Sequence, residues 1–337
     1  MEAAEPATSS RPSNRPIWIG ALSSVVALLL LFWRVRLRDL GTAIAGAHSG
    51  WLVLAAAVFF VMFLVRAWRW SLMLGKTPFW ATWHANIIGY FFNMTLPLRV
   101  GELARGYVIS KSGGITLTRA MSIVIAERLV DLAAVLLLFA GFALRIPMRP
   151  AFTRAATIGS AAVVLALVAA VVVVVKGAAI ERLLERRLAR FGEARAKAVT
   201  SKLTQIRESL QAIGAPRILA PTLLLTAVVW LLTIAFCWLC MKAFLPEGTF
   251  EQAGLVVVIG NLGGALPSAP GGLGIVQGFA TSALVVPFGI DESVAVAFVF
   301  VWSLGAQLAL IALGFVSLGR VGLSFREIRA GAARGGD

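Results

Sequence analysis

Long runs of apolar residues separated by short polar links dominate the hydrophobic pattern of this 337-residue chain. Six runs have about the twenty residues that a helix needs to cross the hydrocarbon core of a bilayer. They predict full crossings at 17–33, 51–70, 118–144, 155–175, 216–244 and 293–318. The pattern is not that of a membrane β-barrel, whose strands alternate apolar and polar residues over short segments.

Four shorter apolar runs flank two prolines. The runs 83–95 and 106–112 lie on either side of Pro97, and the runs 250–266 and 272–288 lie on either side of Pro267. Proline removes a backbone donor and breaks a helix. Because lipid does not tolerate unpaired backbone, each break must face protein or water. The pattern therefore predicts two re-entrant helical hairpins.

The two breaks share the sequence Leu-Pro-x-x-x-Gly and lie 170 positions apart. A shift of 170 residues also superimposes the neighbouring runs, which gives repeat units at about 51–144 and 217–319. Three of the six crossings lie between the hairpins, so the hairpins would enter from opposite faces, as in an inverted repeat. We therefore expect an all-α polytopic membrane protein with six full transmembrane helices and two re-entrant hairpins. The alternative is a chance match, because Pro and Gly are common in membrane helices.

The polar segments define the remaining organisation. Residues 1–16 form a polar tail that we expect to be disordered, and 17–319 form a single transmembrane domain. The segment 176–216 is predicted to be an amphipathic helix on the cytoplasmic face, with a solvated linker helix as the alternative. The tail 320–337 is basic. Both basic segments place the two termini in the cytoplasm by the positive-inside rule, although the arginines near 34–38 and 145–154 argue for the opposite orientation.

Composition narrows the class of protein. The chain is 59% hydrophobic and 14% charged, with a formal net charge of +15. In so apolar a chain the positive charge favours an anionic membrane surface as partner over nucleic acid. Cys237 and Cys240 lie in an apolar run, where packing explains them better than redox chemistry. His48 and His84 lie far apart, so we expect no metal site and no cofactor.

Charged residues within apolar surroundings are the candidates for function, because they are expensive at membrane depth. Around the first break and in the neighbouring runs these are Arg66, Arg69, Arg99, Glu102, Arg105, Glu127, Arg128 and Asp131, with the polar Asn93 beside them. A guanidinium matches the geometry of phosphate oxygens, so the group predicts a site for a lipid head group. The alternative is structural: Arg128 pairs with Glu102 or Glu127, and Arg66 and Arg69 extend to the interface.

The second break carries no charge. Its candidate contacts to a ligand are Pro267, Gly271, Gly272, Gly274 and Gln277. Glycines allow a ligand or another helix to approach the backbone closely, so tight helix packing is the alternative here. The Gly-Lys-Ser/Thr ending of a P-loop is missing from this stretch.

Four motifs together resemble the lysylphosphatidylglycerol synthase transmembrane-region family, also known as flippase-like domain proteins. They are LVRAWRW at 64–70, LPxRxGExxR at 96–105, ERLVD at 127–131 and PxxPGGLG at 267–274. The resemblance covers residues from about 17 to 320. Gln277 stands near a position where this family often has glutamate.

The resemblance implies an integral inner-membrane protein that binds and translocates a phospholipid or a polyprenyl-phosphate lipid. In the synthases, such a region precedes a soluble catalytic domain, and a chain ending at Asp337 leaves no room for one. We therefore expect a transporter that is not an enzyme. A lipid-binding scaffold for a separate lipid-modifying enzyme is the alternative, and a membrane-embedded head-group enzyme is the less favoured one. A homo-oligomer is a further candidate assembly.

Overall fold

The computed structural model describes residues 45–75, 77–96, 100–143, 213–264, 270–324 and 327–328, together with isolated positions at 42 and 145 and between 157 and 211. The described residues form helices joined by short links, and no strand occurs among them. The predicted all-α class is therefore confirmed. The predicted crossing 17–33, most of 155–175 and of 176–216, the N-terminal tail and most of the tail 320–337 lie outside the described residues.

The first half of the described chain consists of four helices. These are α3 (Ser49–Leu74), α4 (Phe79–Thr95), α5 (Gly101–Ser112) and α6 (Leu117–Ala143). Three of them agree with the predicted runs to within about four residues. The start predicted for α5 at residue 106 is wrong, because the helix begins five residues earlier, where Asn93 Oδ1 accepts a hydrogen bond from the backbone N–H of Gly101 at 2.9 Å.

The second half has the same order of long and short helices. It consists of α9 (Pro216–Lys242), α10 (Phe250–Gly264), the short 3₁₀ helix η2 (Pro270–Gly272), α11 (Ile275–Phe288) and α12 (Glu292–Val321). The predicted start of α11 at residue 272 is wrong by three residues. Gly271, Gly272 and Gly274 all have positive φ angles of 70–83°, which a helix cannot contain.

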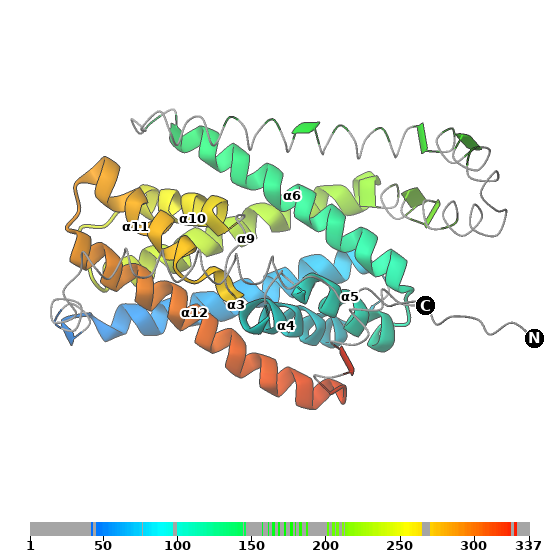
Figure 1. Ribbon diagram of the computed structural model, residues 1–337, viewed down its shortest axis with the longest axis horizontal. Coiled ribbons are helices and arrows are strands. Elements are labelled where there is room, and N and C mark those ends of the chain that lie inside the picture. The colour runs from blue at the N-terminus through cyan, green and yellow to red at the C-terminus, as the bar shows by residue number, and fades with distance from the viewer. Residues whose placement is uncertain are drawn as a thin grey trace, which may run out of the picture.

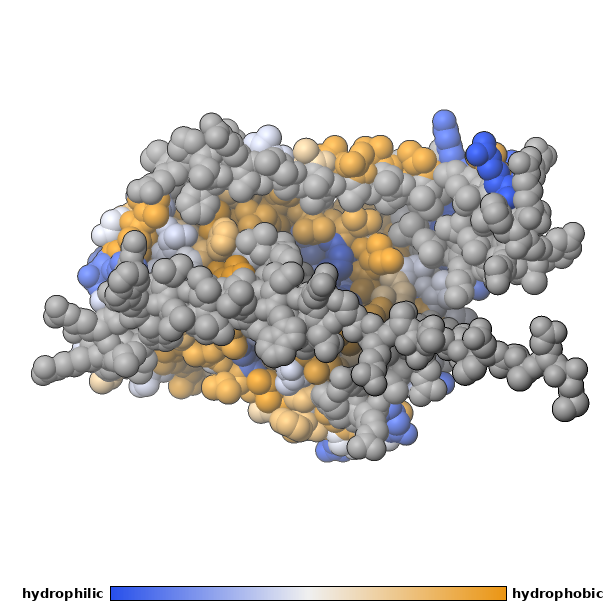
Figure 2. Space-filling view, in the orientation of Figure 1, coloured by the Kyte–Doolittle hydropathy of each residue, from blue (hydrophilic) through white to orange (hydrophobic). Residues whose placement is uncertain are grey.

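Four segments of the described residues are long and apolar enough to cross a membrane: α3, α9, α12 and the stretch Pro270–Phe288. Helix α6 has 27 residues and spans about 40 Å, but it carries charges in its first half. Large apolar side chains such as Val53 and Leu137 are more than 70% exposed, as expected for residues facing lipid. Where the surface in Figure 2 is coloured it is mostly hydrophobic, with one hydrophilic patch near the middle and others toward the two ends.

In Figure 1, α3 and α9 run close to the long axis of the molecule, and α6 and α12 lie obliquely to it. Helix α3 packs along α9, and α12 packs along α4. Helices α4 and α5 form one closely packed pair, and α10 and α11 form another. Because η2 also contacts α4, the turn of the second pair lies against the first pair.

Glycines set the spacing within both pairs. A Cβ at Gly89 of α4 would lie 2.9 Å from Cβ of Arg105, and one at Gly263 of α10 would lie 2.5 Å from the ring of Phe279. The residues between the arms, 97–99 and 265–269, lie outside the described part of the chain. The positions of Pro97 and Pro267 therefore stay predictions, whereas the two helix pairs are observed.

Substituting Gly101 with alanine tests how tightly the first pair is packed. The new Cβ would run into the carbonyl oxygen of Gly89, and a backbone atom cannot move aside. We expect Gly101→Ala to lower the free energy of unfolding by about 1–3 kcal/mol. Thermal unfolding of the purified protein in detergent measures the loss.

The matched control is Gly278→Ala in α11, where a Cβ would meet nothing within 4 Å. Alanine favours a helix over glycine, so this variant should be as stable as the wild type or more stable by up to about 1 kcal/mol. Equal stability of the two variants would contradict the close approach of α4 and α5.

Candidate functional site

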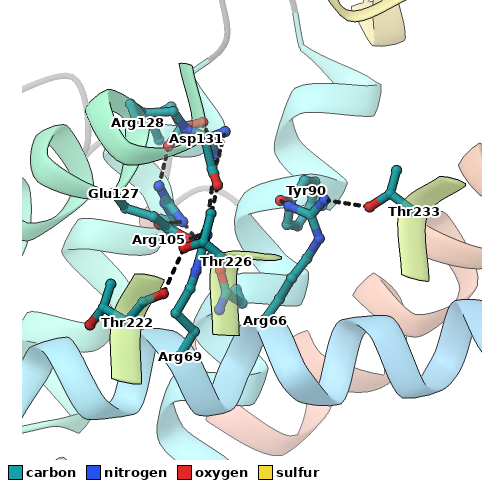
Figure 3. Close-up of polar contacts among 12 residues, drawn as sticks. Arg66, Arg69, Tyr90, Arg105, Glu127, Arg128, Asp131, Thr222, Thr226 and Thr233 are labelled. Carbon is teal, nitrogen blue, oxygen red and sulfur yellow. Dashed lines mark hydrogen bonds and ion pairs between the residues drawn. The ribbon is translucent and has the colours of Figure 1, made fainter. Parts of the chain in front are cut away.

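Three helices bring oppositely charged side chains together inside the bundle. Helix α3 contributes Arg69, α5 contributes Glu102 and Arg105, and α6 contributes Glu127, Arg128 and Asp131. Arg66 of α3 lies beside them (Figure 3). Seven of the eight charged candidates are thus placed in one region by the structure, and the eighth, Arg99, lies outside the described residues.

Glu127 is the centre of this cluster. Its Oε1 lies 2.6 Å from Nη2 of Arg69, and its Oε2 lies 2.7 Å from Nη1 of Arg105. The side chain is buried, with 3% of the residue exposed. One carboxylate therefore binds two guanidinium groups and connects α6 to both α3 and α5.

Arg69 connects three helices. Besides Glu127, it donates hydrogen bonds to both carboxylate oxygens of Asp131, at 2.6 and 3.1 Å, and to the hydroxyl of Thr226 in α9 at 2.9 Å. Glu127 and Asp131 are one helical turn apart on α6, so both can face the same guanidinium. Because Arg69 is completely buried, the interpretation that it extends to the membrane interface is wrong.

Arg105, like Arg69, has several partners. It pairs with Glu127, donates to Oδ1 of Asn86 at 3.3 Å, and lies 2.7 Å from Glu102 within its own helix. Its guanidinium also stacks over the ring of Trp70, 5.0 Å from the centroid. Cation–π contacts of this kind add to ion pairing where water is scarce.

Arg128 and Glu102 form an outer layer of the cluster, which is more exposed than the buried ion pairs. Nη2 of Arg128 lies 2.7 Å from Oε1 of Glu102, and the side chains of these residues are 37% and 23% exposed. A longer contact of 3.9 Å joins Arg128 to Asp131. The predicted alternative that Arg128 pairs with Glu102 thus describes the observed geometry, and the pair is accessible from one side.

Arg66 differs from the other arginines in its partners. It donates to the hydroxyl oxygens of Tyr90 in α4, at 2.9 Å, and Thr233 in α9, at 3.3 Å. Its guanidinium lies 5.9 Å from the ring centroids of Phe63 and Tyr90. Among the described residues, Arg66 makes no ion pair with a carboxylate.

The neutral partners of the cluster were missed by sequence reasoning. They are Asn86, Tyr90, Thr226 and Thr233. Asn86 has a signal that was available, because it lies seven residues before Asn93 in an otherwise apolar run and thus on the same helical face. Single threonines and tyrosines in apolar helices give no comparable signal.

The candidates in the second helix pair form a separate group. Oε1 of Gln277 accepts from the N–H of Gly274 at 2.7 Å, and its Nε2 donates to Ser303 of α12 at 3.0 Å. The carbonyl of Gly271 accepts from Gln307 of α12 at 3.2 Å. A Cβ on Gly271 would meet Met94 of α4 at 3.2 Å, so the pairs touch near their turns.

These contacts show that Gln277 and Gly271 take part in helix packing. Within the described part of the chain, they join none of the second-pair candidates to the charged cluster. The adjacent Gly272 has the same positive φ angle, 70°, as Gly271, and Pro267 lies outside the described residues. Cys237 and Cys240 are both buried and free in α9, in agreement with a packing role.

The paired geometry limits the chemistry of the cluster. A carboxylate that acts as a general base must be able to take up a proton next to the substrate. Glu127 and Asp131 are buried and already bound to arginines, so neither presents a free oxygen to a substrate. Glu102 is the partly exposed carboxylate of the cluster.

Neutralising Glu127 tests whether the cluster holds the helices together. In Glu127→Gln, two buried guanidinium groups would lose their shared carboxylate, and breaking a buried pair in this way costs about 3–5 kcal/mol. We expect a large drop in the midpoint of thermal unfolding in detergent. Glu247→Gln, an exposed site in the link between α9 and α10, is the control and should leave the midpoint unchanged. Equal unfolding midpoints for Glu127→Gln and the wild type would mean that the ion pairs of Glu127 contribute little to stability.

Comparison with known proteins agrees with the motifs. Residues 17–314 match the family described as the lysylphosphatidylglycerol synthase TM region. A protein of Methanothermobacter thermautotrophicus, named UPF0104 membrane protein, is 26% identical over an alignment of 340 residues that covers 94% of this chain and 97% of the relative. No solved structure matches the chain. Because the family match covers most of its length, this multi-pass membrane protein belongs to the lysylphosphatidylglycerol synthase transmembrane-region family.

Proposed function

We propose that this protein is a flippase-like lipid transporter that binds an anionic phospholipid or polyprenyl-phosphate head group at the charged cluster. The observation that carries the proposal is the cluster itself, in which α3, α5 and α6 hold four arginines and three carboxylates among apolar helices. A bundle does not need ionised residues in order to span a membrane, and such residues usually mark a substrate pathway.

The helix order supports a transporter over a simple anchor. A long helix, a close pair of short helices and a second long helix follow one another twice, as α3 to α6 and as α9 to α12. In the proposed topology the short pairs are re-entrant hairpins from opposite faces, and the two halves are an inverted repeat. Transporters of this kind bind substrate near mid-membrane, where the repeats meet.

The proposed movement keeps the two parts of the lipid in different surroundings. The head group passes along the polar layer formed by Glu102 and Arg128, while the acyl chains stay in the bilayer beside the exposed apolar side chains of α3 and α6. This division avoids transferring either the charge or the chains into an unfavourable medium. The contact of Gly271 with the Met94 region would couple one hairpin to the other.

Location and orientation belong to the same proposal. The family resemblance favours the inner membrane, and the excess of lysine and arginine in residues 176–216 and 320–337 favours cytoplasmic termini. The protein has no catalytic role in this proposal. A separate lipid-modifying enzyme would act on the lipid before or after its transfer.

Transport by the purified protein is the decisive test. The protein is reconstituted into liposomes that carry a trace of fluorescent anionic phospholipid in both leaflets, and a membrane-impermeant reductant then bleaches the accessible leaflet. We expect nearly complete bleaching with the wild-type protein and about half in protein-free liposomes, because only a transporter delivers inner-leaflet lipid to the reductant.

A labelled polyprenyl phosphate tests the second lipid class in the same assay. If the protein moves neither lipid but binds one of them in native mass spectrometry, the transporter is contradicted and the lipid-binding scaffold takes its place. Turnover of the head group during the assay would contradict a non-enzymatic role.

A further inference from the structure

Among the described residues, the charges of the cluster cancel except at one residue. Arg69, Arg105 and Arg128 face the three carboxylates of Glu102, Glu127 and Asp131, and every one of these six groups takes part in an ion pair. The paired part is therefore neutral. Arg66 remains as a positive charge that contacts oxygen atoms of neutral hydroxyl groups among the described residues.

Arg66 also has hydrogen-bonding capacity left. A guanidinium has five N–H donors, and the described contacts of Arg66 use one on each terminal nitrogen. Its Nε is buried and has no partner among the described residues. In contrast, both terminal nitrogens of Arg69 donate hydrogen bonds to carboxylates. Those nitrogens of Arg69 therefore already have anionic partners.

A second donor lies next to Arg66. The hydroxyl oxygen of Tyr90 accepts from Nη1 of Arg66, so its own proton is free to be donated elsewhere, and no acceptor for it occurs among the described residues. Two donors of different kinds therefore meet at one point between α3, α4 and α9. Such convergence is how proteins bind an oxyanion.

Extension toward the membrane interface does not explain this geometry. Arg66 lies eight residues before the end of α3 at Leu74, which is about 12 Å along the axis. The guanidinium does not follow the helix toward that end but bridges sideways from α3 to Tyr90 and Thr233 (Figure 3). An arginine that only needed water would have no reason to be held between two other helices.

We infer that the phosphoryl group of the ligand binds at Arg66 and Tyr90, with Thr233 orienting the guanidinium, and that Arg69, Arg105 and Glu127 form the frame that positions this site. The inference rests on the proposed function, in which the ligand is a lipid, and it assigns the anion contact within it. The chemistry recognised is a phosphate oxygen pair, which either a lipid head group or free phosphate can supply.

The site's location fits a lipid better than a free ion. Arg66 and Tyr90 are both partly exposed, whereas Arg69 and Arg105 are buried, so a head group can reach the former pair without breaking an ion pair. Phe60 and Val61 on the same helix are nearly half exposed to the surroundings of the bundle. These residues lie about 8–9 Å from Arg66 along the helix axis and on other faces of α3, so the partial exposure of Arg66 and Tyr90 is what favours a head group.

Binding to single variants tests the assignment. The wild-type protein, Arg66→Gln and Tyr90→Phe are titrated in detergent with an anionic diacyl phospholipid, with diacylglycerol of the same chain length, and with inorganic phosphate, and bound species are counted by native mass spectrometry. We expect Arg66→Gln to weaken phospholipid binding by about tenfold or more, which corresponds to about 1.4 kcal/mol, and Tyr90→Phe to weaken it less. Diacylglycerol binding should not change in either variant.

The controls separate the assignment from folding and from the proposed function. Arg119→Gln removes one exposed positive charge at the start of α6 and should bind as the wild type does. Because Arg66 makes no ion pair among the described residues, Arg66→Gln should also unfold within a few degrees of the wild type. Arg66→Lys keeps the positive charge but loses the bidentate N–H donors of a guanidinium. We therefore expect its affinity for the phospholipid to lie between those of the wild type and Arg66→Gln.

Each outcome has a defined meaning. Wild-type affinity of Arg66→Gln for the phospholipid, together with loss in Arg128→Gln, would overturn the assignment and move the phosphate to the outer ion pair, while leaving the lipid transporter intact. No phospholipid binding by the wild-type protein would contradict the proposed function itself. Binding of inorganic phosphate without lipid, again lost in Arg66→Gln, would support the site and assign it to a free anion.

Discussion

The carboxylate of Glu127, held between Arg69 and Arg105, is the constraint on which the described structure depends. Its two short ion pairs fix α6 against α3 and α5 at the same point. In apolar surroundings neither guanidinium can exchange this partner for water, so separating the helices would strand buried charge. Thr226 extends the same constraint to α9, which already packs along α3. The long helices α3, α6 and α9 are thereby held in one relative position by the contacts of Glu127 and Arg69.

The close packing of the first helix pair makes these ion pairs possible. Gly89 gives Arg105 room to lie against α4, because any larger residue would meet its Cβ at 2.9 Å. Asn93 accepts from the N–H of Gly101 and so fixes where α5 begins, which sets the direction of the Glu102 and Arg105 side chains. Small and uncharged residues of α4 thus determine how the charged residues of α5 meet α6. The ion pairs between α5 and α6 therefore depend on the close packing of α5 against α4.

The sequence predicted the described helices well because apolar length and the stops at proline and glycine are strong local signals. It also predicted which charged residues lie together, since a charge in an apolar run is conspicuous. The pairing was predicted only in part: Arg128 was expected to pair with Glu102 or Glu127, and the sequence could not choose between them because the choice depends on how α5 and α6 approach each other. Tyr90 and Thr233 were missed because their role depends on contacts between helices far apart in sequence.

The division into a buried and an open layer decides which groups can take part in movement. A proton taken up by Glu127 would leave two buried guanidinium groups facing one neutral acid, a cost that few local changes can offset. The Glu102–Arg128 pair has no such penalty, because both side chains reach solvent and each can exchange its partner for a passing ion or head group. In the proposed transport cycle, changes would therefore cost least at the Glu102–Arg128 pair and at Arg66. The inner ion pairs can stay intact throughout, so that the frame keeps its shape while the ligand contacts change.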